Sequence, residues 1–259
     1  MTRQVEPTII ALDGVGDESR AATSAVKEEE LEIAGLRVVS VGDPDEARQV
    51  VVLLHGFAME PRDLSPFAHS LGAPAWFLFP EAPLAAEPRG RAWWHIDAKL
   101  RDQALLQGPR DFAGQHPPDL AAARAQLLSL VTSLAPRIGA RSFVLGGFSQ
   151  GAMLTCDCVL RSTFPLSAMV LLSGSRIAFD EWEPLLPSGR LRGLPTLVAH
   201  GQADADLAFD AGTALRDCLT AAGVELTWQP FEQGHEIPLV VWRRLRKFLA
   251  SLPDPSPRT

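Results

Sequence analysis

The chain of 259 residues has no tyrosine, only three cysteines and no apolar run long enough to span a membrane. The cysteines, Cys156, Cys158 and Cys218, are odd in number, and the first two lie two positions apart. This pattern argues against a disulfide framework and is typical of a reducing compartment. The start, MTRQVEPTII, has no cationic segment followed by an apolar one, so no secretory signal is expected. We therefore expect a cytoplasmic protein without a membrane span.

Positive charge is also scarce. Lysine and arginine number 24 against 31 aspartate and glutamate residues, which gives a net charge of −7. This balance argues against nucleic acid or an anionic membrane as an obligatory partner. Hydrophobic residues make up 46% and charged residues 21%, close to the average of soluble globular proteins. A chain of this length can bury enough surface to fold without a disulfide or a metal.

The two ends differ from the rest in composition. Residues 1–30 contain seven acidic and three basic residues, and this composition predicts a flexible acidic tail. Residues 253–259 alternate proline with polar residues, which predicts an extended, flexible end. The residues between, 31–252, show no internal repeat, and we expect them to form a single domain.

Short apolar runs alternate with helix-forming stretches along this domain. Strands are predicted at Val50–Leu54, Trp76–Phe79, Phe143–Leu145, Ala168–Leu172, Thr196–Ala199 and Glu225–Trp228, with an edge hairpin over Leu31–Val41. Helices are predicted at Pro61–Leu71, Asp119–Leu134, Gln150–Arg161, Asp206–Ala222 and Pro238–Leu252. The alternation predicts an α/β fold, with a mostly parallel central sheet flanked by helices on both faces. The long stretch Pro83–Pro118 is expected to be functional or partly helical.

A candidate nucleophile lies in the pentapeptide Gly-Phe-Ser-Gln-Gly at residues 147–151. It follows the predicted strand Phe143–Leu145 and precedes a predicted helix, which is the strand–turn–helix setting of a nucleophile elbow. The flanking glycines leave room for a strained serine at the tip. The alternative is a glycine-rich turn with an incidental serine. We interpret Ser149 as the nucleophile.

A serine hydroxyl is a poor nucleophile unless an oriented base takes its proton. Downstream of Ser149 the only histidines are His200 and His235. His200 ends a predicted strand, where it would support a turn. His235 lies in a polar loop before the last predicted helix, from which its side chain can reach over the end of the sheet. His235 is therefore the candidate base, and the alternative is that it only caps the helix.

The acid that orients the base should lie in the loop after the strand Thr196–Ala199. This loop contains Asp204 and Asp206. We favour Asp204, because Asp206 is placed to cap the next predicted helix, but the register of a loop is not fixed by its sequence. The chain order Ser149, Asp204, His235 is the one expected of α/β-hydrolases.

Acyl transfer also needs hydrogen-bond donors for the oxyanion. One candidate is the backbone N–H of Gln150, the residue after the nucleophile. The second is the backbone N–H of Phe57 in the loop after the strand Val50–Leu54, where Gly56 lets the backbone approach the ester oxygen. The alternative is that this His-Gly pair is simply a turn that ends the strand.

Together these motifs resemble the phospholipase/carboxylesterase branch of the α/β-hydrolases, which contains acyl-protein thioesterases and small bacterial carboxylesterases. The matching segments are Leu-His-Gly-Phe at 54–57, Phe-Pro-Glu-Ala-Pro at 79–83, Trp-Trp at 93–94, the pentapeptide at 147–151, Ala-His-Gly-x-x-Asp at 199–204 and Gly-His at 234–235. The resemblance implies a triad of Ser149, Asp204 and His235, with Phe57 and Gln150 forming the oxyanion hole. It also implies action on carboxylic esters or thioesters without a metal or organic cofactor.

The candidates for the substrate pocket are Met59, Trp93 and Trp94. Trp93 and Trp94 lie in the long loop, where their aromatic surface suits an acyl or aryl group; the alternative is that they anchor the loop on the core. Met59 and Phe57 are bulky and would narrow the acyl entrance. A metal site built from His55 and His-Ile-Asp at 95–97 has no second spaced pair to support it, so no metal is expected.

The function expected from these features is a serine carboxylesterase that acts on small to medium acyl groups through an acyl-enzyme intermediate. A first alternative is an acyl-protein thioesterase or lysophospholipase that acts on long acyl chains. An alternative of another class is a binding protein that keeps the hydrolase shape without turnover. The expected partner is a small ester or thioester, and the sequence does not predict an oligomeric state.

Overall fold

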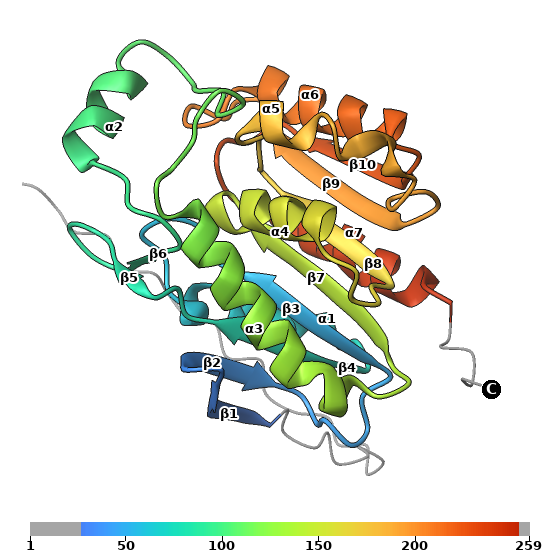
Figure 1. Ribbon diagram of the computed structural model, residues 1–259. Helices are drawn as coiled ribbons and strands as arrows, with labels where there is room; N and C mark the ends of the chain where they lie inside the picture. The colour runs from blue at the N-terminus through green and yellow to red at the C-terminus, as the bar shows by residue number, and fades with distance from the viewer. Residues whose placement is uncertain (1–26, 254–259) are drawn as a thin grey trace, which may run out of the picture.

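An eight-stranded sheet forms the centre of the computed structural model, which describes residues 27–253 (Figure 1). Its strands are β1 Glu28–Ile33, β2 Leu36–Val41, β3 Gln49–Leu54, β4 Ala75–Pro80, β7 Ser142–Phe148, β8 Ala168–Leu172, β9 Pro195–Gly201 and β10 Glu225–Phe231. They lie in the order β1-β2-β4-β3-β7-β8-β9-β10. All pairs from β4 to β10 are parallel, whereas β2 pairs antiparallel with both β1 and β4. A separate two-stranded ribbon joins β5 (Leu84–Ala85) and β6 (Arg91–Ala92).

Helices cover both faces of this sheet. They are α1 Ser65–Leu71, α2 Ala98–Leu105, α3 Leu120–Ile138, α4 Gln150–Arg161, α5 Phe179–Trp182, α6 Phe209–Ala221 and α7 Leu239–Ser251, with short 3₁₀ turns η1 Pro61–Asp63 and η2 Leu186–Ser188. Helices α3, α4 and α6 pack on one face, and α1 and α7 on the other (Figure 1). Helix α2 stands apart from the sheet at one corner of the molecule.

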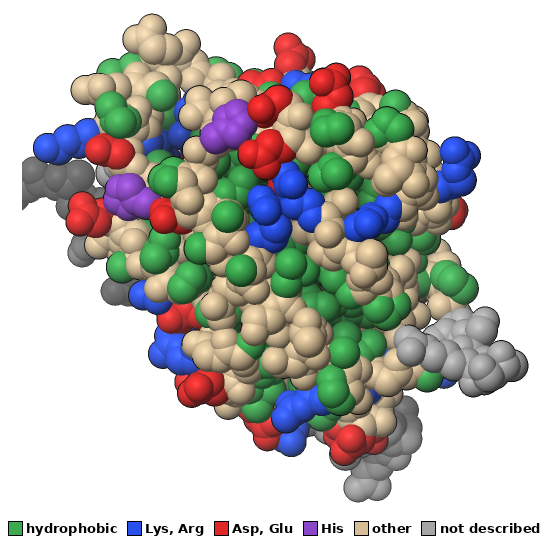
Figure 2. Space-filling model, in the orientation of Figure 1, with side chains coloured by type: hydrophobic (Ala, Val, Ile, Leu, Met, Phe, Trp, Pro, Cys, Tyr) green, Lys and Arg blue, Asp and Glu red, His purple; other side chains and the backbone are tan. Residues whose placement is uncertain are grey.

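The alternation of side chains along β3 divides the core in two. Val50, Val52 and Leu54 point into the cluster beneath α3 and α4, while Val51 and Leu53 point into the cluster beneath α1 and α7. All five are almost fully buried. A strand that is apolar on both sides is what a doubly covered sheet requires, because successive side chains enter opposite layers. On the face covered by α3, α4 and α6, the described surface mixes basic and acidic side chains with hydrophobic ones (Figure 2).

The predicted strands and helices agree with the structure to within a few residues at their ends, and the prediction of a mostly parallel sheet covered on both faces is confirmed. One boundary is wrong. The flexible tail predicted for residues 1–30 cannot include its last three residues, because Glu28, Glu29 and Glu30 pair with β2 as the first half of β1. Their charge is partly balanced by Arg62, which bonds both Glu28 and Glu30. The rest of the predicted tail, 1–26, and residues 254–259 lie outside the described residues.

The topology gathers four loops at one edge of the sheet. Ser149 follows β7, Asp204 follows β9, His235 follows β10 and Gly56 follows β3. Because these strands are parallel, their carboxyl ends meet on the same side, where open α/β sheets place their sites. Residues up to 180 positions apart in the sequence, such as Gly56 and His235, are thereby brought to one rim.

Candidate active site

Ser149 sits at a strained turn between β7 and α4. Its backbone has φ 52° and ψ −115°, a conformation rare for a residue with a side chain. The turn closes only because glycines flank it. A Cβ on Gly147 would lie 2.5 Å from the carbonyl carbon of Gly151, and one on Gly151 would lie 2.4 Å from the carbonyl oxygen of Leu54. The Ser149 N–H donates to the Leu172 carbonyl at 2.8 Å, which ties the turn to β8.

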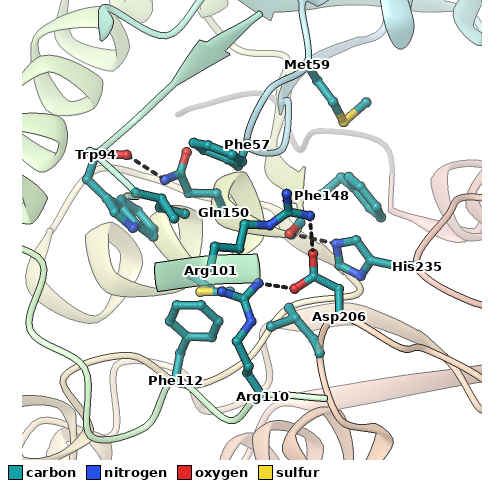
Figure 3. Close-up of a pocket in the computed structure, with 14 residues that line it drawn as sticks. Phe57, Met59, Trp94, Arg101, Arg110, Phe112, Phe148, Gln150, Asp206 and His235 are labelled. Carbon is teal, nitrogen blue, oxygen red and sulfur yellow. Dashed lines mark hydrogen bonds and ion pairs between the residues drawn. The ribbon is translucent and has the colours of Figure 1, made fainter. Parts of the chain in front are cut away.

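His235 lies between Ser149 and Asp204 and contacts both. Its Nε2 is 2.9 Å from Ser149 Oγ, and its Nδ1 is 2.7 Å from Asp204 Oδ2. Since a carboxylate can only accept, Nδ1 carries a proton toward Asp204, and the neutral ring then leaves Nε2 free to accept the hydroxyl proton of Ser149. The ring of Phe148 packs beside the imidazole, with centroids 4.9 Å apart. Figure 3 shows the His235 ring beside Phe148 at the edge of the cavity.

Asp204 is held rigidly in its loop. Its side chain is fully buried, and its Oδ1 accepts the backbone N–H groups of Asp206 at 2.9 Å and Leu207 at 2.8 Å. These bonds aim Oδ2 at His235. Of the two aspartates that the sequence left open, Asp204 contacts the imidazole. The N-cap residue of α6 is Ala208, so Asp206 does not cap that helix.

Asp206 instead pairs with two arginines. Its carboxylate bonds Arg110, and its Oδ2 lies 3.1 Å from Arg101 Nη2. Burial by itself would raise the pKa of Asp206, but the hydrogen bonds and charges of Arg110 and Arg101, together with the charge interaction with His235, outweigh it and hold the pKa below its usual range. Sequence reasoning missed this group, because Arg101 and Arg110 lie about a hundred positions from Asp206 and no motif connects them.

His200 lies beneath the loop that carries Asp204. It is fully buried, its Nε2 donates to the Leu207 carbonyl at 3.1 Å, and burial lowers its pKa. A Cβ on Gly212 would lie 2.3 Å from its Nδ1, so α6 closes directly over the ring. These contacts agree with the interpretation of His200 as a support for the turn.

The loop after β3 lies against the nucleophile. A Cβ on Gly56 would come within 3.0 Å of the Phe148 ring and 3.3 Å of Ser149 Cβ, so the backbone at this position is as close to Ser149 as packing permits. Gln150 is the first residue of α4, and N–H groups in the first turn of a helix have no intrahelical partner. The helix dipole adds partial positive charge at the same point. The loop and the first turn of the helix thus both bring backbone N–H groups close to Ser149.

A buried histidine holds this loop. Nδ1 of His55 donates to the Gly56 carbonyl at 2.7 Å, and its Nε2 accepts the Ala82 N–H at 3.1 Å. The His55 carbonyl accepts the indole N–H of Trp93 at 3.0 Å. Burial lowers the pKa of His55 to about 4, so the ring stays neutral and can accept and donate at once. His55, which was considered above as a metal ligand, therefore supports the loop instead.

The side chain of Gln150 has a second role that sequence reasoning missed. Its Oε1 accepts the Trp93 N–H at 2.8 Å, and its Nε2 donates to the Trp94 carbonyl at 2.9 Å. The residue next to the nucleophile therefore fixes the Trp93–Trp94 segment against the site. The signal available in the sequence was a polar side chain at a position that the helix pattern predicts to be buried.

A cavity of about 230 Å³ opens beside Ser149 and His235 (Figure 3). Its apolar walls include Phe57, Met59, Trp94, Ile96, Phe112 and Met153. Of the three predicted pocket residues, Met59 and Trp94 line this cavity. Trp93 does not, because it is turned onto the core, where its ring packs 5.6 Å from that of His55. For Trp93 the structure therefore supports the alternative role of a loop anchor.

The cysteines lie away from these residues. Burial raises the pKa of Cys156 and Cys158, and it raises that of Cys218 to about 11, so each thiol is protonated at neutral pH. Within residues 27–253, no cluster of three or more histidine, cysteine or acidic side chains could hold a metal ion. None of the described helices is both long and apolar enough to cross a membrane.

Known proteins resemble this chain in sequence and in fold. Acyl-protein thioesterase 1 of Neurospora crassa is 32% identical over 120 residues, which are 43% of this chain and 46% of that protein, so the match spans about half the length of the relative. The crystal structure of a carboxylesterase from Mesorhizobium loti superposes with a TM-score of 0.66 and 19% identity, and covers 86% of this chain and 99% of its own. Acyl-protein thioesterase 2 of Zea mays gives a TM-score of 0.69 with 20% identity over 83% of this chain and 98% of its own.

The two solved structures confirm the prediction of an α/β-hydrolase fold. A family model described as Phospholipase/Carboxylesterase matches residues 33–252, which include all four loops that meet at the rim. The chain belongs to the phospholipase/carboxylesterase family.

Proposed function

We propose that the protein is a serine carboxylesterase in which Ser149, His235 and Asp204 form the catalytic triad. The observation that carries the proposal is the position of the His235 ring, with one nitrogen 2.9 Å from Ser149 Oγ and the other 2.7 Å from a buried carboxylate. A histidine in this position can remove the serine proton and is oriented for the task. Membership of the family supports the same reaction class.

In the proposed reaction His235 takes the proton of Ser149 while the oxygen attacks the ester carbonyl carbon. Asp204 stabilises the imidazolium that forms and remains a carboxylate. The tetrahedral intermediate collapses as His235 gives its proton to the leaving alcohol, which leaves an acyl group on Ser149. Water, activated by His235, then attacks this acyl-enzyme and releases the acid.

The negatively charged oxygen of each tetrahedral intermediate needs hydrogen-bond donors beside Ser149. We assign the backbone N–H groups of Phe57 and Gln150 to this task, because the first lies in the loop pressed against the serine and the second begins α4. Loss of one such donor typically costs on the order of 2.7–4 kcal/mol of barrier stabilisation. The bonds around His55 support the assignment, since they fix the loop before substrate binds.

The size of the cavity favours small to medium acyl groups. A volume of about 230 Å³, bordered by Phe57 and Met59, is below the range of about 300–1,000 Å³ typical of drug-sized ligand sites. A second candidate is a thioesterase for longer acyl chains. It is favoured by the partial match to an acyl-protein thioesterase and by an adjoining cavity of about 480 Å³ that shares Trp94 and Phe112 with the first. A profile of turnover from acetyl to palmitoyl esters and thioesters distinguishes the two.

The proposal is tested by hydrolysis of a short-chain p-nitrophenyl ester. We expect turnover by the natural sequence and none above background by Ser149→Ala, with the same circular dichroism spectrum for both proteins. Unchanged turnover by Ser149→Ala would show that another residue is the nucleophile. Absence of turnover by both on a broad ester and thioester panel would favour the third candidate, a binding protein with a hydrolase fold. We further propose a cytoplasmic location, which three unpaired cysteines suit.

A further inference from the structure

Two arginines line the same cavity as Ser149 and His235. Arg101 projects from α2, and Arg110 comes from the loop that follows this helix. Figure 3 shows both guanidinium groups gathered around the carboxylate of Asp206, next to His235. Their side chains are 31% and 17% exposed, so both are partly withdrawn from water.

The charges of this group do not cancel. Apart from the proposed triad, the charged side chains that line the cavity are Arg101, Arg110 and Asp206. Two cations share one carboxylate, so this group of three side chains carries one net positive charge in a chain whose net charge is −7. A partly buried, uncompensated cation is costly unless an anion completes the group.

The guanidinium groups also have donors to spare. Nε of Arg110 is buried and has no hydrogen-bond partner among the described residues. An arginine presents five donors, and each of these two bonds Asp206 through Nη2. Apart from these two bonds, neither guanidinium group makes a hydrogen bond with a described residue, so donors remain for a ligand carboxylate in the cavity that both side chains line.

The position of Arg110 is fixed before any ligand binds. Its N–H donates to the Asp206 carbonyl at 2.9 Å, and its own carbonyl accepts the Ala208 N–H at 2.9 Å. The guanidinium stacks on Phe112, with its carbon 4.7 Å from the ring centroid, and Arg101 lies 5.7 Å from the centroid of Phe57. Arg110 is thus held by two backbone hydrogen bonds against the segment that follows Asp204, the proposed triad acid. Such preorganisation reduces the entropy lost on binding.

We propose that the preferred substrates are short esters that carry a carboxylate, which Arg101 and Arg110 bind while the ester group lies at Ser149. This inference rests on the proposed esterase function. A carboxylate fits because its two oxygens match the planar fork of a guanidinium, and because charge-assisted bonds of this kind are the strong ones. The cavity beside Ser149, of about 230 Å³, has room for a short ester, and the same two arginines also line the adjoining cavity of about 480 Å³.

The test compares carboxylate esters with carboxamide analogues of the same shape. Monomethyl glutarate and methyl glutaramate differ in this group on the acyl side of the ester. The acetyl esters para-acetoxybenzoate and para-acetoxybenzamide differ on the alcohol side. We expect kcat/KM to be at least about tenfold higher for the carboxylate member of one pair, which is the size expected of one charge-assisted bond. The pair that shows the preference identifies the side of the ester that faces the arginines.

Substitutions then connect the preference to the two arginines. Arg101→Gln and Arg110→Gln should each lower the carboxylate-to-carboxamide ratio by about tenfold. Asp206→Asn should raise the ratio, because it removes the competing carboxylate. The matched control is Arg176→Gln, which breaks an ion pair with Asp111 outside the cavity lining and should leave the ratio unchanged. Should one arginine variant fail to fold, the other and Asp206→Asn still decide.

Binding without turnover separates this inference from the function on which it rests. Calorimetry on Ser149→Ala with the benzoate and benzamide probes should give tighter binding of the carboxylate, again lost in a double variant with Arg110→Gln. Equal binding of both probes, or a ratio at or below one in the natural sequence for both pairs, overturns the inference even if neutral esters are hydrolysed. Tighter carboxylate binding in a protein that hydrolyses no ester would overturn the esterase proposal alone.

Discussion

His235 Nδ1 lies 2.7 Å from Oδ2 of Asp204, whose other oxygen is held by two backbone N–H groups. The aspartate that orients the ring is therefore itself oriented by its loop. In contrast, the side chain of Asp206, two residues further on, bonds Arg101 and Arg110. The two aspartates of this loop therefore have different partners, and their substitution should affect catalysis differently.

Asp204→Asn should lower kcat for a neutral p-nitrophenyl ester by about a thousandfold to ten-thousandfold, since the amide favours the wrong tautomer of His235. The matched change Asp206→Asn keeps the bond between Asp204 and His235, so its loss should be at least about a hundredfold smaller. Steady-state kinetics of both variants measures the difference. Equal losses would contradict the assignment of Asp204 as the triad acid.

His55 predicts how stability depends on pH. Its pKa in the folded protein is about 4, below the ordinary value near 6.5, because its ring is buried. Between these values the unfolded chain binds more protons than the folded one, so the free energy of unfolding should fall as the pH drops from about 6.5 to about 4. The share of His55 is up to about 3 kcal/mol. Urea unfolding at several pH values measures the slope.

Two variants isolate the contribution of His55 to the pH dependence of the free energy of unfolding. His55→Asn should be less stable at neutral pH, because the bonds to Gly56 and Ala82 are disturbed, but should lose less stability between about pH 6.5 and 4. His95→Asn, at an exposed position, should keep the slope of the natural sequence. An identical slope in His55→Asn would show that the ring is not held neutral by burial.

The side chain of Gln150 can be tested apart from its backbone. Gln150→Met keeps the N–H proposed for the oxyanion hole but leaves the Trp93 N–H and the Trp94 carbonyl without partners. We expect a loss of about 1–3 kcal/mol in the free energy of unfolding for each unpaired group, with a lower kcat/KM because the wall at Trp94 is released. Gln126→Met loses one bond to the Ala34 carbonyl far from the site and should leave kcat/KM unchanged.

A buried carboxylate on α4 predicts a change in stability without a change in chemistry. Asp157 is fully buried and bonds Arg124 at 2.5 Å, Arg161 at 3.0 Å and the indole N–H of Trp182 at 2.9 Å. Asp157→Ala should lower the free energy of unfolding by about 3–5 kcal/mol, because two partly buried cations lose their partner. Chemical unfolding measures this loss.

The control is an exposed pair. Asp217 bonds Arg216 at the surface, with 64% of its side chain exposed, and Asp217→Ala should lower the free energy of unfolding far less than Asp157→Ala does, because water screens an exposed pair. A loss in Asp157→Ala no larger than that in Asp217→Ala would mean that the buried group does not stabilise α4.

Most of the sheet and the meeting of the triad candidates could be predicted from the sequence. Strands buried on both faces are apolar throughout, so runs such as Val50–Leu54 were distinct from the helices between them. The elbow at Ser149 had a strand before it and a helix after it, and parallel strands carry their carboxyl ends to one edge. Chain order and position then favoured His235 as the base and left Asp204 and Asp206 as the candidates for the acid, of which Asp204 was preferred.

Other features depend on contacts that no local pattern contains. Helix α2 was not assigned because it has no continuous apolar stripe, although Asp97 before it was a usable sign: its side chain accepts the N–H groups of Lys99 and Leu100 at 2.8 and 3.0 Å. The three glutamates at the start of β1 are poor strand formers in isolation. Two of them, Glu28 and Glu30, are stabilised here by ion pairs with Arg62, more than thirty positions away.

The most direct test of the central claim is covalent labelling with a fluorophosphonate, followed by mass spectrometry of the digested protein. An activated serine hydroxyl displaces fluoride from this reagent, whereas an ordinary serine does not react. We predict one adduct, on the peptide that contains Ser149, and its loss in His235→Ala. An adduct on a different residue, or no adduct in a folded and ester-hydrolysing protein, would contradict the account.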